Sequence, residues 1–268
     1  MTTLATSPVA THQLPIALVT GAGSGIGQAV AIHLAGLGYH LLVTDVNSSA
    51  AEQTVAAIAA EGGSASSHKL DVTSEEDIEL ITQTIRQDFG RIDVLVNNAG
   101  IQHVAKLEEF PVDRWKLIND ILLVGPAMLT RALLPLMREQ NYGRIVNIGS
   151  IHGLIASPFK SAYVAAKHGL LGFSKVIALE TAEQDITINT LCPAYVKTAL
   201  VEQQITAQAA EHGISEDEVI NEIMLAPMPK KSFISTDELC GSIGYVISDA
   251  ARNMTGQTLV LDGAWTAR

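Results

Sequence analysis

Several kinds of residue are scarce in this chain, and each scarcity excludes a class of protein. Cys192 and Cys240 are the only cysteines, too few for a disulfide framework, which indicates a reducing compartment. Lysine and arginine number 17 against 28 acidic residues, and no basic stripe is visible, so nucleic acid is not an expected partner. No stretch reaches about eighteen uninterrupted apolar residues, so we expect no membrane span.

The amino-terminal residues 1–14 lack the basic start and the apolar core of a secretory signal. We expect a flexible tail there, followed by one domain over residues 15–268, because no linker or composition break interrupts that range. A reducing compartment without a membrane span predicts a cytoplasmic location, and no metal site is expected.

Apolar residues, in contrast, are abundant: they make up 47% of the chain, against 17% charged residues. Short runs rich in Ile, Val and Leu alternate with Ala-rich segments of helix length. This alternation predicts an α/β fold, a Rossmann-type doubly wound parallel sheet of about seven strands with helices on both faces. The predicted strands are Ile16–Thr20, His40–Thr44, Ala65–Leu70, Ile92–Val96, Arg144–Ile148, Thr187–Leu191 and Thr258–Leu261.

One segment interrupts this alternation. Residues 198–235 form a long insertion after the sixth predicted strand, helical in pattern and rich in Gln and Glu. Long excursions near a binding site are often lids, so we expect a helical lid here. The alternative is a pair of surface helices with no role in binding.

A glycine-rich turn directly follows the first predicted strand. The sequence from Thr20 to Gly27 is TGAGSGIG, and residues 28–37 have a helical pattern. Glycines let the backbone approach a pyrophosphate, and the next helix aims its free N–H groups at that charge. Any tight turn of this kind favours glycine, but the flanking strand and helix make the motif specific. The predicted dinucleotide contacts are Gly21, Ser24, Gly25, Ile26 and Gly27.

Asp45 ends the second predicted strand, where a carboxylate accepts hydrogen bonds from an adenosine ribose and repels a 2′-phosphate. Lys69 is the only lysine or arginine before Arg86, so the first βαβ unit offers no obvious cation for that phosphate. The predicted cofactor is therefore NAD rather than NADP. The alternative for Asp45 is a turn or helix-capping role.

Further candidates follow the third and fourth predicted strands, at the sheet edge where ligands of doubly wound folds lie. Asp71 and Val72 are placed to flank the adenine. The pair Asn97 and Asn98 either caps a helix or holds the cofactor loop, and we assign Asn98 to the cofactor site.

Ser150, Tyr163 and Lys167 form a second constellation. Tyr163 and Lys167 are four residues apart in the predicted helix 161–181 and share a face, and Ser150 follows the fifth predicted strand. A phenol with a pKa near 10 needs a drop of roughly three units, or about 4 kcal/mol, to act as a base near pH 7. The Lys167 ammonium and a positive nicotinamide ring both favour that drop.

A Tyr-x-x-x-Lys pair alone is more often an exposed helix pair. Beside Ser150 and the glycine turn, however, it predicts hydride transfer between a nicotinamide and an alcohol or ketone. Tyr163 is the predicted general base or acid, and it also contacts the cofactor, as does Lys167. Ser150 is predicted to hold the substrate oxygen.

Other residues are candidates for binding the rest of the substrate. Lys160 stands at the start of the Tyr163 helix, where a cation is disfavoured by roughly 0.3–1 kcal/mol unless an anion neutralises it. Each candidate alone is weak evidence, since surface lysines and structural histidines are common. An ammonium, an imidazole and two amides that converge would make a site for a small carboxylate. The predicted substrate contacts are Gln102, His152, Lys160 and Gln204.

These motifs resemble the short-chain dehydrogenase/reductase family over residues 15–263. The resemblance rests on TGAGSGIG (20–27), NNAG (97–100), Ser150, YVAAK (163–167) and CPAYVKT (192–198). It implies that Val196 and Thr198 contact the nicotinamide carboxamide and that the protein is a homotetramer. Within the family, members acting on small 3-hydroxy acids are similar in GIQHV (100–104), SIHG (150–153), KSAYVAAKHG (160–169), LVEQQI (200–205) and LDGAWTAR (261–268).

One position departs from the family pattern. The resemblance implies a catalytic Asn seven residues after Trp115, but position 122 is Leu, and the nearest amide is Asn119. The family's Asn holds a water that passes the proton onward from the lysine. That relay must here be built from another residue or from a backbone carbonyl.

Other functions stay open at this point. The chain could act on an uncharged ketone, a polyol or a 3-oxoacyl thioester instead of a small acid. It could also be a non-catalytic dinucleotide-binding protein on the same fold. The intact Ser150, Tyr163 and Lys167 set argues against the non-catalytic alternative.

Overall fold

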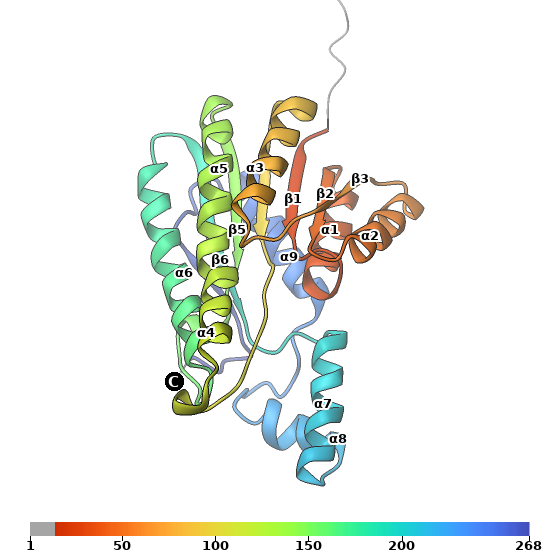
Figure 1. Ribbon diagram of the computed structural model, residues 1–268, viewed down its shortest axis with the longest axis vertical. Helices are drawn as coiled ribbons and strands as arrows, with labels where there is room; N and C mark the ends of the chain where they lie inside the picture. Colours follow the sequence, from red (N-terminus) through yellow and green to blue (C-terminus); the bar gives the residue numbers. More distant parts are fainter. Residues whose placement is uncertain (1–13, 268) are drawn as a thin grey trace, which may run out of the picture.

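The computed structural model describes residues 14–267, so nearly all of the predicted tail lies outside the described residues. Seven parallel strands form one sheet in the order β3-β2-β1-β4-β5-β6-β7, which confirms the doubly wound fold (Figure 1). The strands are β1 (Ile16–Thr20), β2 (His40–Asp45), β3 (Ser64–Lys69), β4 (Val94–Asn97), β5 (Tyr142–Ile148), β6 (Asp185–Pro193) and β7 (Thr258–Leu261).

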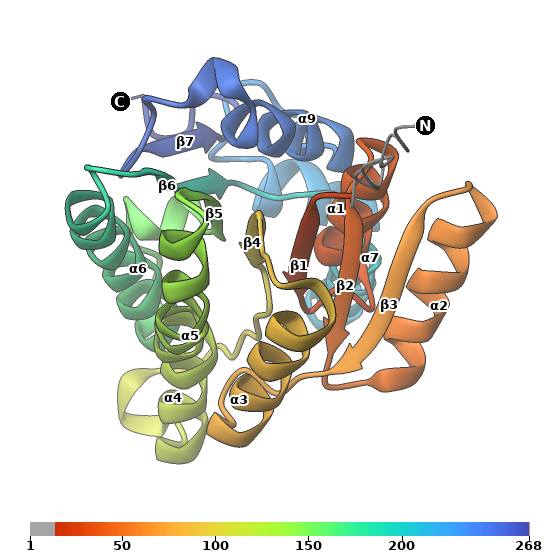
Figure 2. The same cartoon turned by 90° about the horizontal axis from the view of Figure 1, so that it is seen from above.

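Helices cover the sheet on both faces (Figure 2). The α-helices are α1 (Gly25–Gly36), α2 (Ser48–Ala60), α3 (Glu75–Thr84), α4 (Val112–Asn119), α5 (Gly125–Glu139), α6 (Ser161–Glu180), α7 (Ala199–His212), α8 (Glu216–Glu218) and α9 (Thr236–Ile247). Three π-helical turns, η1 (Ile85–Phe89), η3 (Asp120–Val124) and η5 (Val219–Met224), and three 3₁₀ turns, η2 (Leu107–Glu109), η4 (Ile151–Gly153) and η6 (Asp249–Ala251), complete the helical elements of the described residues.

Two apolar clusters hold these layers together. On one face α1, α2 and α9 pack on the strands through residues such as Leu34, Ile58 and Ile243. On the other face α3, α5 and α6 do so through residues such as Ile81 and Leu133. The central strands are buried on both sides, which is why they consist of near-continuous apolar residues.

Two details of the sequence-based expectation are wrong. Strand β3 reads SASSHK and is half-buried, not an apolar run, because it lies at the edge of the sheet. Its polar side chains bond along the sheet, with the His40 ring 2.7 Å from the Ser64 hydroxyl. Helix α1 begins at Gly25, three residues earlier than its apolar pattern suggests, so two of the motif glycines lie inside its first turn.

Among the residues that the structure describes, one helical stretch, Val112–Glu139, is long and apolar enough to cross a membrane by length and composition. It comprises α4, η3 and α5. Its residues Leu129, Leu133 and Met137 are fully buried against the sheet. A core helix of this fold passes the same test of length and composition, so the stretch is weak evidence for a membrane span.

The insertion after β6 forms a separate helical layer at the lower end of the molecule in Figure 1. It contains α7, α8 and η5. Its base packs on the glycine-rich turn, because Ile26 of α1 contacts the cluster of Val196, Leu225 and Met228. The insertion therefore adjoins the end of the sheet where the candidate residues lie.

Candidate active site

The glycine-rich turn is built so tightly that side chains are excluded from it. A Cβ on Gly27 would lie 2.3 Å from the Gly21 carbonyl oxygen and 2.4 Å from the Asn98 amide nitrogen. Gly21 adopts φ +63° and Gly25 φ +56°, the left-handed region that disfavours other residues. Close contacts and positive φ angles therefore explain why glycine stands at these predicted positions.

The amino terminus of α1 is open to an anion. Ser24 occupies the cap position in an extended conformation, yet its side chain makes no capping bond, and no acidic residue lies in the first turn. The first N–H groups of a helix carry partial positive charge and need an acceptor. These residues fit a dinucleotide pyrophosphate, which is the ligand that the motif predicts.

Asn98 holds this turn in place. Its amide Nδ2 donates to the carbonyl oxygens of Thr20 at 2.9 Å and Gly21 at 3.1 Å. The Thr20 hydroxyl in turn accepts from the backbone N–H groups of Asn98 and Ala99, both at 3.0 Å. The loop after β4 and the glycine-rich turn are therefore one rigid unit.

Asp45 stands beside the glycine-rich turn at the end of β2. Its carboxylate accepts from the backbone N–H of Gly23 at 3.0 Å and of Asn47 at 2.9 Å. Gly23 is required for this contact, since a Cβ there would lie 2.9 Å from the Asp45 oxygen. Lys69 of β3 is in register with Asp45, so the first βαβ unit does bring a cation to this edge, contrary to the expectation from sequence.

The other predicted cofactor contacts occupy loops at the same edge. Asp71 folds its carboxylate onto the N–H and hydroxyl of Thr73, and Val72 is buried against Gly125 of α5. Val196 is buried and forms a bridge with Ile234, while Thr198 caps α7.

The structure brings Ser150, Tyr163 and Lys167 together. Ser150 is close enough to the Tyr163 phenol to lower its pKa, and the Lys167 Nζ lies 5.7 Å from the centroid of the Tyr163 ring. Nζ donates to the carbonyl of Ile148 at 2.6 Å, which anchors the buried lysine to the end of β5. Helix α6 is itself tied to the sheet through Ser174, which accepts from the Asn147 amide at 2.9 Å.

Burial sets the ionisation of this group. Burial raises the pKa of Tyr163, and the nearby Ser150 side chain opposes that rise without cancelling it. Burial also lowers the pKa of Lys167 to about 8, so its ammonium persists at pH 7. The surroundings of Tyr163 in the chain therefore raise its pKa and do not supply the drop that a general base near pH 7 needs.

His152 lies between Ser150 and the carboxyl-terminal segment. Its ring is 6.1 Å from the Tyr163 ring and 6.3 Å from the Trp265 ring, both edge-on. Trp265 also lies 6.1 Å from Tyr195. Asp262 fixes the turn that carries Trp265, since its carboxylate accepts from three donors within 2.9 Å.

Trp265 is a site residue that sequence reasoning misses. Its one signal is composition: aromatic residues make up only 4% of the chain, and Trp265 is one of two tryptophans. The ending in which it stands enters only as a point of resemblance. Nothing in the linear spacing connects it with His152, which lies more than a hundred residues earlier.

Burial, with added repulsion from Lys160 and His168, lowers the pKa of His152 to about 4. The unfolded chain binds this proton near pH 6.5, so stability is lost as pH falls from about 6.5 toward 4. After a discount for solvent screening we expect His152 to account for about 2 kcal/mol of that loss. Urea unfolding at pH 7 and pH 5 should show a smaller loss for His152→Gln than for the wild type. Equal losses would exclude His152 as the source.

The predicted substrate residues are only partly brought together. Lys160 is half-buried at the start of α6 and close enough to His152 to lower its pKa. Gln102 is exposed and accepts from its neighbour's N–H, but its loop is joined to the Lys160 loop by the bond from Ala105 N–H to the Phe159 oxygen, 3.0 Å. The Gln204 side chain, on α7, lies outside the described residues.

Leu122 stands at the position of the expected catalytic amide, and Asn119, the nearest amide, lies three residues earlier. Leu122 is buried in an apolar cluster with Phe110 and Ala166, against which Tyr163 packs. Asn119 directs its amide to the Trp115 carbonyl of its own helix at 2.9 Å. Neither side chain therefore offers a free polar group to Lys167.

Comparisons with known proteins agree with this geometry. A model of the short chain dehydrogenase family matches residues 15–209. The chain is 43% identical over 254 residues to a D-beta-hydroxybutyrate dehydrogenase of Rhizobium meliloti, covering 94% of this chain and 98% of the relative. It is also 43% identical over 252 residues to one of Cupriavidus necator, with the same coverage. A 3-oxoacyl-[acyl-carrier-protein] reductase of Synechocystis is 36% identical over 250 residues, 92% of this chain and 95% of the relative.

Proposed function

Because the chain belongs to the short-chain dehydrogenase/reductase family of nicotinamide-dependent oxidoreductases, we propose that it oxidises D-3-hydroxybutyrate to acetoacetate with NAD, reversibly. When bound, the nicotinamide ring would supply the hydride chemistry. The proposed cofactor contacts are Gly21, Ser24, Gly25, Ile26, Gly27, Asp45, Asp71, Val72, Asn98, Tyr163, Lys167, Val196 and Thr198.

The chain's own residues handle the proton and the substrate oxygen. Tyr163 takes the hydroxyl proton as the hydride leaves the carbon, and Ser150 orients the oxygen through a hydrogen bond. Lys167 keeps a positive charge beside the phenol ring, and its anchor at Ile148 fixes its position. In ketone reduction the same atoms act in reverse.

The substrate assignment rests on one observation: the half-buried ammonium of Lys160 has no carboxylate partner among the described side chains. Among the described side chains no carboxylate lies within 4.0 Å of its ammonium, although burial lowers its pKa and so disfavours the charge. A substrate carboxylate would stabilise the charged form of Lys160, because a half-buried ammonium that lacks an ionic partner is strongly stabilised when it acquires one. We assign Gln102, His152 and Gln204 to the same carboxylate.

A substrate screen tests the function directly. We expect NADH formation from NAD with D-3-hydroxybutyrate, and much slower formation with its neutral ester, with polyols and with 3-hydroxyacyl thioesters. Faster turnover of the thioester would favour the activity named for the Synechocystis relative. No turnover with any of them would favour a binding protein.

The cofactor preference follows from Asp45. We expect kcat/KM to be higher with NAD than with NADP, because the carboxylate repels a 2′-phosphate. Asp45→Ala should raise kcat/KM with NADP by about tenfold, the effect of removing roughly 1.4 kcal/mol of repulsion. Lys69→Ala in the Asp45→Ala background should reverse that gain, since Lys69 is the cation in register. Equal use of both cofactors by the wild type would contradict the assignment.

We further propose that residues 198–235 act as a lid. The base of this segment contacts Ile26 of the cofactor turn, and Tyr195, just before it, lies beside Trp265. Closure over these residues would exclude water from the reacting atoms.

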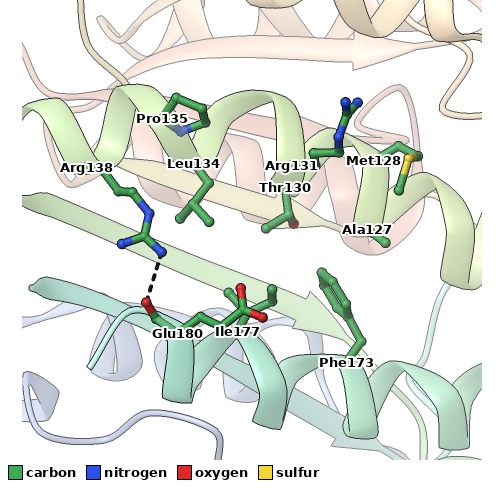
Figure 3. Close-up of a pocket in the computed structure, with 10 residues that line it drawn as sticks. All are labelled: Ala127, Met128, Thr130, Arg131, Leu134, Pro135, Arg138, Phe173, Ile177 and Glu180. Carbon is green, nitrogen blue, oxygen red and sulfur yellow. Dashed lines mark hydrogen bonds between the residues drawn. The ribbon is translucent and has the colours of Figure 1, made fainter. Parts of the chain in front are cut away.

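We propose that the protein is a homotetramer in the cytoplasm. A hollow of about 330 Å³ lies between α5 and α6, and its lining combines apolar residues such as Met128, Leu134 and Phe173 with polar and charged ones such as Arg131 and Glu180 (Figure 3). The same pair of helices exposes 80% of Leu179. Exposed apolar side chains on these two helices support a subunit contact.

A further inference from the structure

A line of polar side chains crosses the apolar core between α6 and the sheet. This polar line runs from Asn97 of β4 through Asn147 of β5 to Ser174 of α6 and on to Thr190 of β6. The four residues are at most 5% exposed, and each contact between neighbours is 2.8 or 2.9 Å. Burying polar groups costs stability unless each is hydrogen-bonded, so a satisfied line of this kind holds its elements in one arrangement.

Ser174 is the centre of the polar line, because its hydroxyl oxygen makes three bonds. It donates its proton to the Leu170 carbonyl of its own helix at 2.8 Å and accepts from the Asn147 amide at 2.9 Å. The contact with the Thr190 hydroxyl, also 2.9 Å, must then be donated by Thr190, since a serine hydroxyl has one proton and two lone pairs. One atom of α6 is therefore fixed to two strands at once.

The same face of α6 carries the proposed catalytic pair. Lys167 and Tyr163 precede Ser174 by about two and three helical turns, so the three side chains point to one side of the helix. Lys167 meets β5 at the Ile148 carbonyl, at 2.6 Å, and Ser174 meets the strand one residue earlier. Bonds to two consecutive residues of β5 therefore seat α6 on the strand that leads to Ser150.

Thr190 also lies against the backbone that carries Ser150. A Cβ on Gly149 would be 2.7 Å from the Thr190 methyl carbon, so the glycine lets this side chain lie directly against the end of β5. The Gly149 N–H donates to the Leu191 carbonyl at 2.6 Å, which joins the two strands there. Thr190 is thus in contact with α6 through its hydroxyl and with the residue before Ser150 through its methyl group.

We propose that Ser174, Asn147 and Thr190 are positioning residues of this enzyme. Their hydrogen bonds set how α6 sits on β5 and β6, and thereby the distance from Tyr163 to Ser150. The three residues do not touch the reacting atoms and act through the elements that carry the catalytic group. This inference rests on the proposed dehydrogenase function and deepens it.

The chemical step depends on this distance. The substrate hydroxyl has to meet Tyr163 and Ser150 at the same time, and a misplacement of about 1 Å caused far from the chemistry can cost about 10²-fold in rate. The glycine-rich turn and Asp45 follow β1 and β2, whereas Ser174 is bonded to β5 and β6. We therefore expect a fault in the polar line to slow hydride transfer and to leave cofactor binding nearly unchanged.

Thr190→Val tests the proposal with little disturbance, because valine has the shape of threonine without its hydroxyl. Enzyme saturated with NAD is mixed with D-3-hydroxybutyrate, and the rate of the first NADH formed per site is measured. Substrate deuterated at the hydroxyl-bearing carbon should slow this phase, which identifies it as hydride transfer. We expect the rate in Thr190→Val to fall about tenfold, less than the effect of a 1 Å shift, because Asn147 still holds Ser174.

Two further variants extend the test. Ser174→Ala removes the central oxygen and leaves the Asn147 amide and the Thr190 hydroxyl without their acceptor, so its rate per site should fall by about 10²-fold. Thr190→Ser restores a hydroxyl at the same position and should recover most of the rate. NADH fluorescence titration counts the sites in each variant, and its affinity should stay close to that of the wild type.

Thr181→Val is the matched control. Thr181 is fully buried and caps the carboxyl end of α6, and its hydroxyl donates to the Ile177 carbonyl of the same helix at 2.8 Å. The substitution removes the same atom as Thr190→Val and leaves the bonds of Ser174 to the sheet in place. We expect the wild-type rate per site, whatever the loss of stability.

Wild-type rates per site in Thr190→Val would overturn the proposal and leave the polar line a purely structural feature, even if the melting temperature falls. An equal slowing in Thr181→Val would overturn it too, since the effect would then come from the stability of α6. If Ser174→Ala does not fold, the Thr190 variants decide. The proposed function fails differently, as a wild type that forms no NADH from D-3-hydroxybutyrate. The rates are then measured with whichever alcohol the wild type oxidises, and a wild type that oxidises none overturns both.

Discussion

Tyr163→Phe should leave NADH binding nearly intact and reduce kcat by 10²–10⁴-fold, the range for removing a positioned general base. The substitution removes one oxygen, the proposed proton acceptor. The ring remains, and its packing on Leu122 and Ala162 is unchanged. Steady-state rates with D-3-hydroxybutyrate measure the first effect, and NADH fluorescence titration measures the second.

Tyr245→Phe serves as the control for this experiment. Tyr245 is 48% exposed on α9, remote from the site, so its hydroxyl should not affect turnover. A Tyr163→Phe enzyme that keeps more than about a tenth of the wild-type kcat would contradict a general-base role of this size.

Lys160→Ala should raise KM for D-3-hydroxybutyrate and lower kcat/KM by about 2–3 kcal/mol, the range for one charged hydrogen bond. In the productive orientation the hydroxyl meets Tyr163 and Ser150, so the carboxylate, two carbons from the reacting carbon, points away from that pair. Stripping water from an anion is costly unless charge and donors replace it. Lys160 is the proposed source of that charge.

Substrate charge and matched lysine variants separate this role from a structural one. The neutral ester should be a poor substrate for the wild type and should lose little from Lys160→Ala. Lys160→Arg should keep most of the activity with the acid. Lys106→Ala removes an exposed lysine paired with Glu109 at 3.8 Å and should change nothing. If the acid and the ester are affected equally, Lys160 is structural and the hydroxy-acid assignment loses its main support.

Periodicity and motif spacing are sufficient for the fold and for the chemical class. Strands β1 and β7 have the predicted bounds, because short apolar runs flanked by turn residues are local signals. The glycine-rich turn is also predicted from the sequence, because the close contacts around Gly21 and Gly27 leave no room for a Cβ atom. The four-residue spacing of Tyr163 and Lys167 is enough to place them on one helix face.

The environment of each group is decided only by the tertiary structure. The register of β3 with β2 sets Lys69 beside Asp45, and no spacing in the chain announces that neighbour. Burial raises the Tyr163 pKa, although the nearby lysine alone suggests the opposite. Desolvation depends on everything packed around a group, so it cannot be read from the residues that flank it in sequence.

The sequence by itself therefore predicted a dinucleotide site and, beside it, Ser150, Tyr163 and Lys167 as the catalytic group. The tertiary structure decided that both nitrogens of His152 are engaged by serines and that Trp265 closes on the same imidazole. The physical reason is the sequence separation of the interacting residues. Turns and helix faces depend on neighbours a few residues apart, whereas burial, ring contacts and side-chain hydrogen bonds between elements depend on segments that are distant in the sequence.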